Sequence, residues 1–356
     1  MRNLRQNNFE VLRVLSIFLI IASHCFYFGI KQHPVHQNLS VEGLAGMLNY
    51  LTAEGLYLLA GIGVNCFVMI SGYFMINRPQ MRYKGIMHVW LLTSFYSIIG
   101  YIVMTAVSGE SVRFIGIVDY IEPIHSNKYW FVSQYIGMAL IAPFIAKGVV
   151  SLQKREYLAL LMVLFILFFE VPWGGVFCDG HSLTWFLFLF LLGGFLKKYE
   201  LPAIIIKHIG KINIAIWLLM LLLFTGANMY INKDCGSFSL MNVNNNNLRL
   251  FLSLSVFIWF MKYPMNGRCL SLLSKVAPYV FGVYLIHEHP MIKKELWVVA
   301  IPDTIQIPLA LYVLLVTIVI FSICTIVDMV RDRVFKMLRI QNLLEKIDDK
   351  LKSNFI

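Results

Sequence analysis

The chain has 356 residues, of which 59% are hydrophobic and only 14% are charged. Soluble domains carry about 45–50% apolar and about 25% charged residues, so this composition excludes an ordinary soluble domain, a disordered chain and a disulfide-stapled secreted module. The net charge of +11 comes from basic residues that lie between apolar segments, a pattern of cytoplasmic loops rather than of a nucleic-acid-binding patch. We therefore predict an all-α polytopic membrane protein with no nucleic-acid partner.

A helix needs about 20 mostly apolar residues to cross the hydrocarbon of a bilayer. Ten segments of the chain approach this length, and the count depends on how residues 171–183 are divided. In chain order they are 9–30, 56–77, 85–107, 129–146, 157–173, 182–196, 213–232, 248–262, 278–290 and 306–330. We predict ten transmembrane helices.

The basic residues of the loops predict the orientation of these helices. Of the 30 Lys and Arg residues, 22 fall in the two termini, in the loops after the second, fourth, sixth and eighth predicted helices, or at Lys262 where the eighth helix ends, and 6 fall in the other loops. Because cytoplasmic loops are enriched in Lys and Arg, both termini are predicted to be cytoplasmic. We expect a transmembrane domain over 1–330 and a cytoplasmic tail over 331–356, which reads as an amphipathic helix on the inner leaflet.

The first predicted helix carries three ionisable residues, Glu10, Arg13 and His24, each costly inside a membrane. Arg13 and His24 are eleven residues apart, about 20° from a whole number of turns, and Glu10 precedes Arg13 by three. All three therefore share one stripe, with His24 about 16 Å farther toward the outside than Arg13. We expect Glu10 and Arg13 to pair and His24 to act as a general base. The alternative is an interfacial ion pair and a histidine that is only a hydrogen-bonding core residue.

Polar groups near the predicted inner face suggest an anion site. Ser71 lies in the small-residue segment 63–73, in which Gly63 and Gly72 are expected to serve helix packing. Arg78, Arg82 and Lys84 follow it and are candidates for binding phosphates, although positive-inside topology explains them equally well.

A second set lies near the predicted outer ends of later helices. Its members are Trp130, Ser133, His181, Trp185, His287 and Glu288. His287 is expected at the outer depth of His24, Tyr129 in an interfacial aromatic belt, and His289 in solvent. The six cysteines are too dispersed for a metal framework; Cys178 and Cys235 fall outside, where a disulfide and two free thiols are both open.

Several short motifs together resemble the acyltransferase-3 family of integral membrane acyltransferases, particularly bacterial cell-surface polysaccharide O-acetyltransferases. The motifs are Phe9–Arg13 with His24 after ten intervening residues, Phe67–Tyr73, Tyr129–Ser133 running to Pro143, Trp185–Gly194 and Tyr284–His287. Glu10 stands where many relatives have Asp. Arg78 and Arg82 have three residues between them where the family motif has two, so which basic residue contacts the donor stays open.

The resemblance implies ten helices, a cytoplasmic acyl-CoA donor and a sugar hydroxyl on a polysaccharide or lipid-linked glycan as acceptor. His24 matches the family's catalytic histidine and Arg13 its partner arginine. No permanently bound cofactor is expected, and homo-oligomerisation stays open. Two other classes compete with this interpretation: a transporter of an acyl group or lipid-linked glycan, for which we find no clear inverted repeat, and an assembly subunit of a glycan-export machine.

Overall fold

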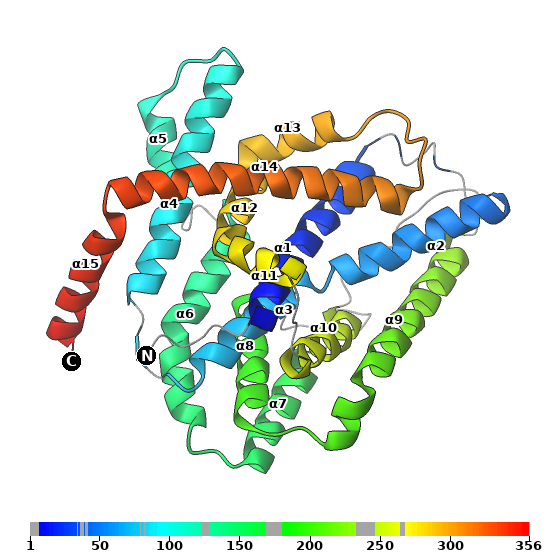
Figure 1. The fold of residues 1–356 in the computed structure, drawn as a ribbon, viewed down its shortest axis with the longest axis horizontal. Coiled ribbons are helices and arrows are strands. Elements are labelled where there is room, and N and C mark those ends of the chain that lie inside the picture. The colour runs from blue at the N-terminus through cyan, green and yellow to red at the C-terminus, as the bar shows by residue number, and fades with distance from the viewer. Residues whose placement is uncertain are drawn as a thin grey trace. The chain divides into compact units, whose positions relative to one another are not determined.

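A computed structural model describes residues 7–33, 35, 39, 42–78, 80–81, 83–122, 128–168, 180–232, 246–263 and 268–355. These described residues form helices and turns and contain no strand, as the composition predicts (Figure 1). Within the described part of the chain, six helical segments are long and apolar enough to cross a membrane. They are Asn7–Ile30, Gly43–Met75, Tyr83–Val107, Trp130–Val149, Ala203–Ala227 and Leu309–Met337.

The four other predicted spans correspond to shorter helices. These are α7 (Lys154–Phe168), α8 (Leu183–Lys198), α10 (Asn246–Lys262) and α12 (Val280–His287). The count of ten spans and the cytoplasmic location of the termini therefore stay predictions, and part of the predicted span 157–173 lies outside the described residues.

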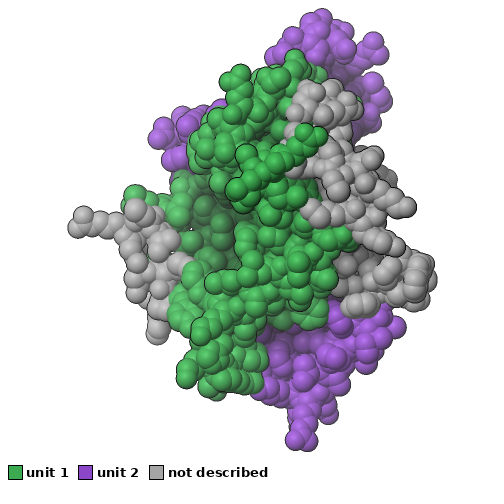
Figure 2. Space-filling model, turned by 90° about the vertical axis from the view of Figure 1, so that its right-hand side faces the viewer, with its two compact units in different colours: residues 1–67, 200–280, 294–322 green, residues 68–199, 281–293, 323–356 purple. Residues whose placement is uncertain are grey.

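The chain divides into two compact units, coloured separately in Figure 2. Unit 1 comprises residues 1–67, 200–280 and 294–322. Its helices are α1 (Asn7–His24), the π-helix η1 (Cys25–Ile30), α2 (Gly43–Ala60), α9 (Ala203–Asn232), α10 and α11 (Arg268–Val276), with most of α13 (Pro290–Ala300) and the first half of α14 (Leu309–Met337). Within it α1 packs against α2, α10 and α11, and α9 packs against α2 and α10.

The second apolar segment differs from its prediction at both its start and its middle. α2 begins at Gly43, whose φ of 69° suits glycine, thirteen residues before the predicted start at 56. Helix α3 (Gly63–Met75) then follows a break at Gly61 and Ile62. A Cβ on Gly63 would lie 2.5 Å from the Ser16 carbonyl oxygen of α1, so this glycine serves close helix packing, as predicted.

Unit 2 comprises residues 68–199, 281–293 and 323–356. It contains most of α3 and of α12, together with α4 (Tyr83–Val107), α5 (Phe114–Ile121), α6 (Trp130–Val149), α7, α8, the second half of α14 and α15 (Ile340–Phe355). Within it α4 packs against α5, α6 and α15, and α8 packs against α6 and α7.

Two glycines let α3 and α8 approach closely in unit 2. A Cβ on Gly72 would clash with the backbone of Phe190, and a Cβ on Gly193 would clash with the Met69 carbonyl. The small residues of segment 63–73 therefore set a helix contact, and Gly72 has the packing role predicted for it.

Residues Ile340–Phe355 of the tail form helix α15, which packs against α4. α14 continues past the predicted boundary at 330 to Met337, and the chain bends at Arg339, whose φ is 52°. Leu344 and Asp348 of α15 are buried, on the helix that packs against α4. Whether other parts of α15 touch the inner leaflet stays a prediction.

Candidate active site

Helix α1 holds the first predicted set of residues. Glu10 is 5% exposed, and its Oε1 accepts a hydrogen bond from Arg13 Nη1 at 2.6 Å, so the predicted pair is formed. The i,i+3 spacing brings the two side chains together on one face of the helix. Glu10 thus fixes the position of the Arg13 guanidinium, which keeps a quarter of its side-chain surface exposed.

His24 is the last residue of α1, and the π-helix η1 begins directly after it. The wider turn is closed by the Lys31 N–H, which donates to the Phe26 carbonyl at 2.9 Å. Because π-turns widen a helix locally and occur frequently at functional sites, this one marks His24. The half-buried imidazole lies 5.5 Å from the Phe28 ring, centroid to centroid. Sequence reasoning missed the π-turn because residues 25–30 read as ordinary continuation of an apolar helix.

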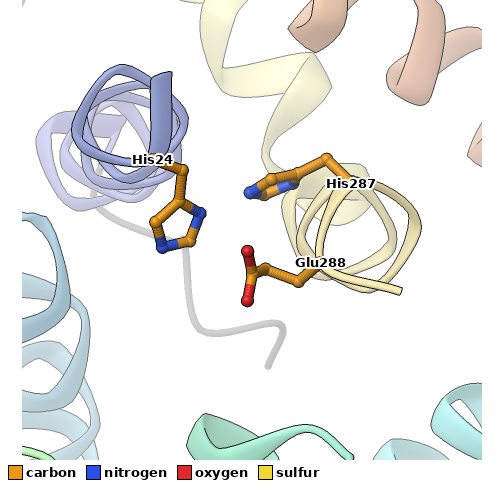
Figure 3. Close-up of side chains that lie close together, drawn as sticks. All are labelled: His24, His287 and Glu288. Carbon is orange, nitrogen blue, oxygen red and sulfur yellow. The ribbon is translucent and has the colours of Figure 1, made fainter. Parts of the chain in front are cut away.

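His287 and Glu288 lie at the end of α12 in unit 2, and Figure 3 shows their side chains as well as that of His24 on α1. His287 is fully buried, and its Nδ1 lies 2.7 Å from the Val283 carbonyl oxygen. Since a carbonyl only accepts, Nδ1 carries the proton, and in the neutral ring Nε2 then carries the lone pair. The buried Glu288 carboxylate accepts from Lys293 Nζ at 3.3 Å. Glu288 is therefore a paired buried acid.

Two neighbours of this site differ from their predictions. His289 is fully buried rather than solvated: its Nε2 donates to the Ser97 carbonyl at 3.0 Å and its Nδ1 accepts from the Met291 N–H at 3.3 Å. The prediction is wrong because the chain turns between α12 and α13 and brings this ring onto α4. Tyr129 is also buried rather than in an exposed aromatic belt, and its hydroxyl donates to the Leu285 carbonyl at 3.2 Å.

The starts of α6 and α8 come together through the predicted aromatic residues. Trp130 contacts His181 edge-on with ring centroids 4.4 Å apart. Trp185 is buried, and its backbone N–H donates to Ser182 Oγ, which caps the start of α8. Ser133 Oγ lies 3.4 Å from the Tyr129 carbonyl oxygen, to which it donates. Trp130 and His181 are therefore in contact within unit 2, and Trp185 lies in the first turn of α8.

The residues predicted to bind the acyl-CoA donor lie on different elements of unit 2. Ser71 Oγ lies 3.4 Å from the Tyr135 hydroxyl, and Arg78 is exposed beyond α3. Lys84, in the first turn of α4, has its ammonium 2.6 Å from Glu345 Oε1 of the tail. Arg82, Cys178 and Cys235 lie outside the described residues.

One comparison with known proteins decides the family. A family model described as an acyltransferase domain matches residues 6–329, nearly the whole chain. The chain belongs to the acyltransferase-3 family. The protein is therefore a membrane acyltransferase, in agreement with its long apolar helices. No significant match was found among the curated proteins or the solved structures compared with it.

Sequence reasoning missed a buried ionic cluster of this acyltransferase. Asp328 of α14 is fully buried: its Oδ1 accepts from the Tyr96 hydroxyl at 2.6 Å, and its two oxygens accept from Arg331 Nε and Nη2 at 3.0 and 2.6 Å. A Cβ on Gly282 would clash with its carboxylate, so α12 presents a glycine there. The available signal was an acidic residue inside the predicted span 306–330.

Sequence reasoning also gave no role to two basic residues at the end of α8, Lys197 and Lys198. Lys198 Nζ donates to the carbonyls of Val149, Val150 and Leu152, at 3.0, 2.7 and 3.1 Å, where it satisfies the end of α6. Lys197 Nζ lies 4.8 Å above the Tyr73 ring. Two consecutive lysines at the end of a predicted span were the signal, because cations are favoured at helix C-termini.

Proposed function

We propose that this acyltransferase moves an acetyl or other small acyl group from cytoplasmic acyl-CoA to a hydroxyl of a cell-surface or lipid-linked polysaccharide. Its location would be the bacterial cell membrane. The observation that supports this most is on α1: a paired arginine in the second turn of the helix and a half-buried histidine at its last residue, directly before a π-turn. Both belong to the motif on which the family resemblance rests.

In the proposed reaction a ring nitrogen of His24 removes the proton from the acceptor hydroxyl. The hydroxyl oxygen then attacks the thioester carbonyl carbon, a C–O bond forms, and the C–S bond breaks. Coenzyme A leaves as a thiolate and takes the proton from His24, so the histidine returns to its neutral form. In this proposal the acyl transfer needs no added cofactor.

The remaining predicted residues have supporting roles in this proposal. The phosphates of the donor would bind near Arg78, Arg82 and Lys84, with Ser71 and the Arg13 charge along the path of the pantetheine arm. That arm, when extended, can cover the roughly 16 Å of helix rise between Arg13 and His24. The acceptor sugar would meet the aromatic rings of Trp130, His181 and Trp185 and the polar groups of Ser133, His287 and Glu288. Aromatic rings offer flat apolar faces for the C–H faces of sugars.

The test is acyl transfer by the purified protein in detergent, with radiolabelled acetyl-CoA and a glycan acceptor from the same organism. His24→Gln keeps a hydrogen-bonding side chain but removes the base, and it should lower kcat about 10²- to 10⁴-fold. His208→Gln on α9 removes the same kind of ring elsewhere and should leave kcat within about twofold. Turnover in detergent, with no sealed compartment, separates an enzyme from a transporter. An active His24→Gln enzyme would contradict the proposed mechanism.

A further inference from the structure

The tail helix α15 contacts the start of α4 through two carboxylates. Asp348 Oδ1 accepts from the backbone N–H of Lys84 at 3.0 Å, and Glu345 Oε1 lies 2.6 Å from the Lys84 ammonium. Lys352 Nζ binds the second oxygen of Asp348 at 2.7 Å and so holds that carboxylate in place. One residue of α4 therefore binds two acidic side chains of the tail.

The fold brings α15 to this position by two further features. Phe335, near the end of α14, packs edge-on against Phe95 of α4 with ring centroids 5.2 Å apart. The chain then bends at Arg339, which adopts the left-handed conformation that non-glycine residues rarely take. Leu344 and Asp348 are one helical turn apart, and both are buried, so they define the docked face of α15.

The chemistry of this contact is that of an anion at a cationic site. The first N–H groups of a helix carry partial positive charge, and the Lys84 ammonium adds a full one. Carboxylate oxygens bind such groups in the same way as phosphate oxygens do. The ion pair is partly exposed, 35% at Lys84 and 60% at Glu345, so it is open to exchange with another anion. The whole of α15 lies outside the matched family region 6–329.

We propose that α15 is an autoinhibitory latch whose Glu345 and Asp348 carboxylates occupy Lys84 until the phosphates of the acyl-CoA donor displace them. This inference rests on the proposed function, which assigns Lys84 to the donor site. In such a competition the apparent affinity for the donor equals the intrinsic affinity multiplied by the fraction of molecules in which the tail is undocked. A latch docked in nine molecules of ten would raise the apparent KM for acyl-CoA about tenfold.

The test uses the full-length protein with the double substitution Glu345→Gln and Asp348→Asn. We expect the KM for acetyl-CoA to fall about threefold to tenfold with kcat at saturation unchanged, because the donor no longer competes with the tail. Asp349→Asn is the matched control: it removes one charge from the exposed side of α15 and should leave KM unchanged. A double variant with wild-type kcat and wild-type or higher KM would overturn the latch while leaving the acyltransferase proposal intact.

A readout without turnover follows the tail itself. Trypsin cleaves after Lys346 and Lys350, which are exposed on α15 but held in a docked helix. Coenzyme A should accelerate this cleavage in the wild-type protein and have little effect in the double variant, in which cleavage is already fast. Coenzyme A that raises thermal stability but leaves the cleavage rate unchanged would overturn the latch. If no variant bound coenzyme A at all, the donor assignment and the latch would both fall.

Discussion

Replacing Asp328 by asparagine removes the charge that balances Arg331 in the interior of unit 2. The carboxylate is fully buried and accepts three hydrogen bonds, two from Arg331 and one from the Tyr96 hydroxyl. An amide can accept at only one of the two positions, and its NH₂ group would face a donor at the other. The Arg331 side chain, 7% exposed, would keep its positive charge with only the partly exposed Asp332, 3.6 Å away, as a counter-charge.

The size of the effect follows from this geometry. Removing one partner of a buried ion pair costs about 3–5 kcal/mol, because the desolvated charge that remains is not compensated. Asp332 supplies the matched control: its Oδ1 lies 3.6 Å from Arg331 Nη1, but its side chain is 26% exposed. Asp332→Asn should therefore cost at most about 1 kcal/mol.

The free energy of unfolding is measured in detergent by titration with a denaturing detergent, followed by tryptophan fluorescence. A double variant, Asp328→Leu with Arg331→Met, should recover much of the loss, since no charge then remains buried. If Asp328→Asn were as stable as Asp332→Asn within about 0.5 kcal/mol, the buried-charge reasoning would be refuted.

Two further predictions concern helix packing and the tail. Gly72→Ala should lower the free energy of unfolding by about 1–3 kcal/mol, because the added Cβ would clash with the backbone of Phe190 and force α3 and α8 apart. Gly148→Ala is the control, since its added Cβ meets no atom within 4 Å. In the same unfolding titration it should raise the free energy of unfolding by about 0.5–1 kcal/mol. The hydrogen bond from Lys352, followed by that from the Lys84 N–H, holds the pKa of Asp348 below its ordinary 3.8. Docking of α15 is therefore stabilised at neutral pH and is lost as the pH falls below about 3.8, through the lowered pKa. An acid-active protease should therefore cleave α15 faster at pH 3 than at pH 5, and equal rates would contradict the link between Asp348 protonation and docking. After a brief acid pulse and a return to neutral pH, the rate of tail cleavage should match that of the untreated protein.

Much of the fold is local in origin and could be predicted. Long apolar segments can only be buried or lie in lipid, so the helices of 9–30, 85–107 and 306–330 follow from composition alone. The Glu10–Arg13 pair was predictable because residues three apart on a helix are neighbours. Gly63 and Gly72 were predictable helix contacts for a different local reason, since small residues let helix backbones approach closely.

The tertiary structure decided whatever depends on groups far apart in the sequence. Hydrophobicity does not distinguish an α-helical from a π-helical turn, so the transition after His24 had no sequence signal. His289 and Tyr129 were expected in solvent and at an interface, but the carbonyls that they bind, on Ser97 and Leu285, lie on other helices. Lys84 looked like a free phosphate ligand because its partner Glu345 lies 261 residues away. A spacing rule relates residues within one or two helical turns, whereas the burial and the ion pairs of a side chain depend on which helices pack together.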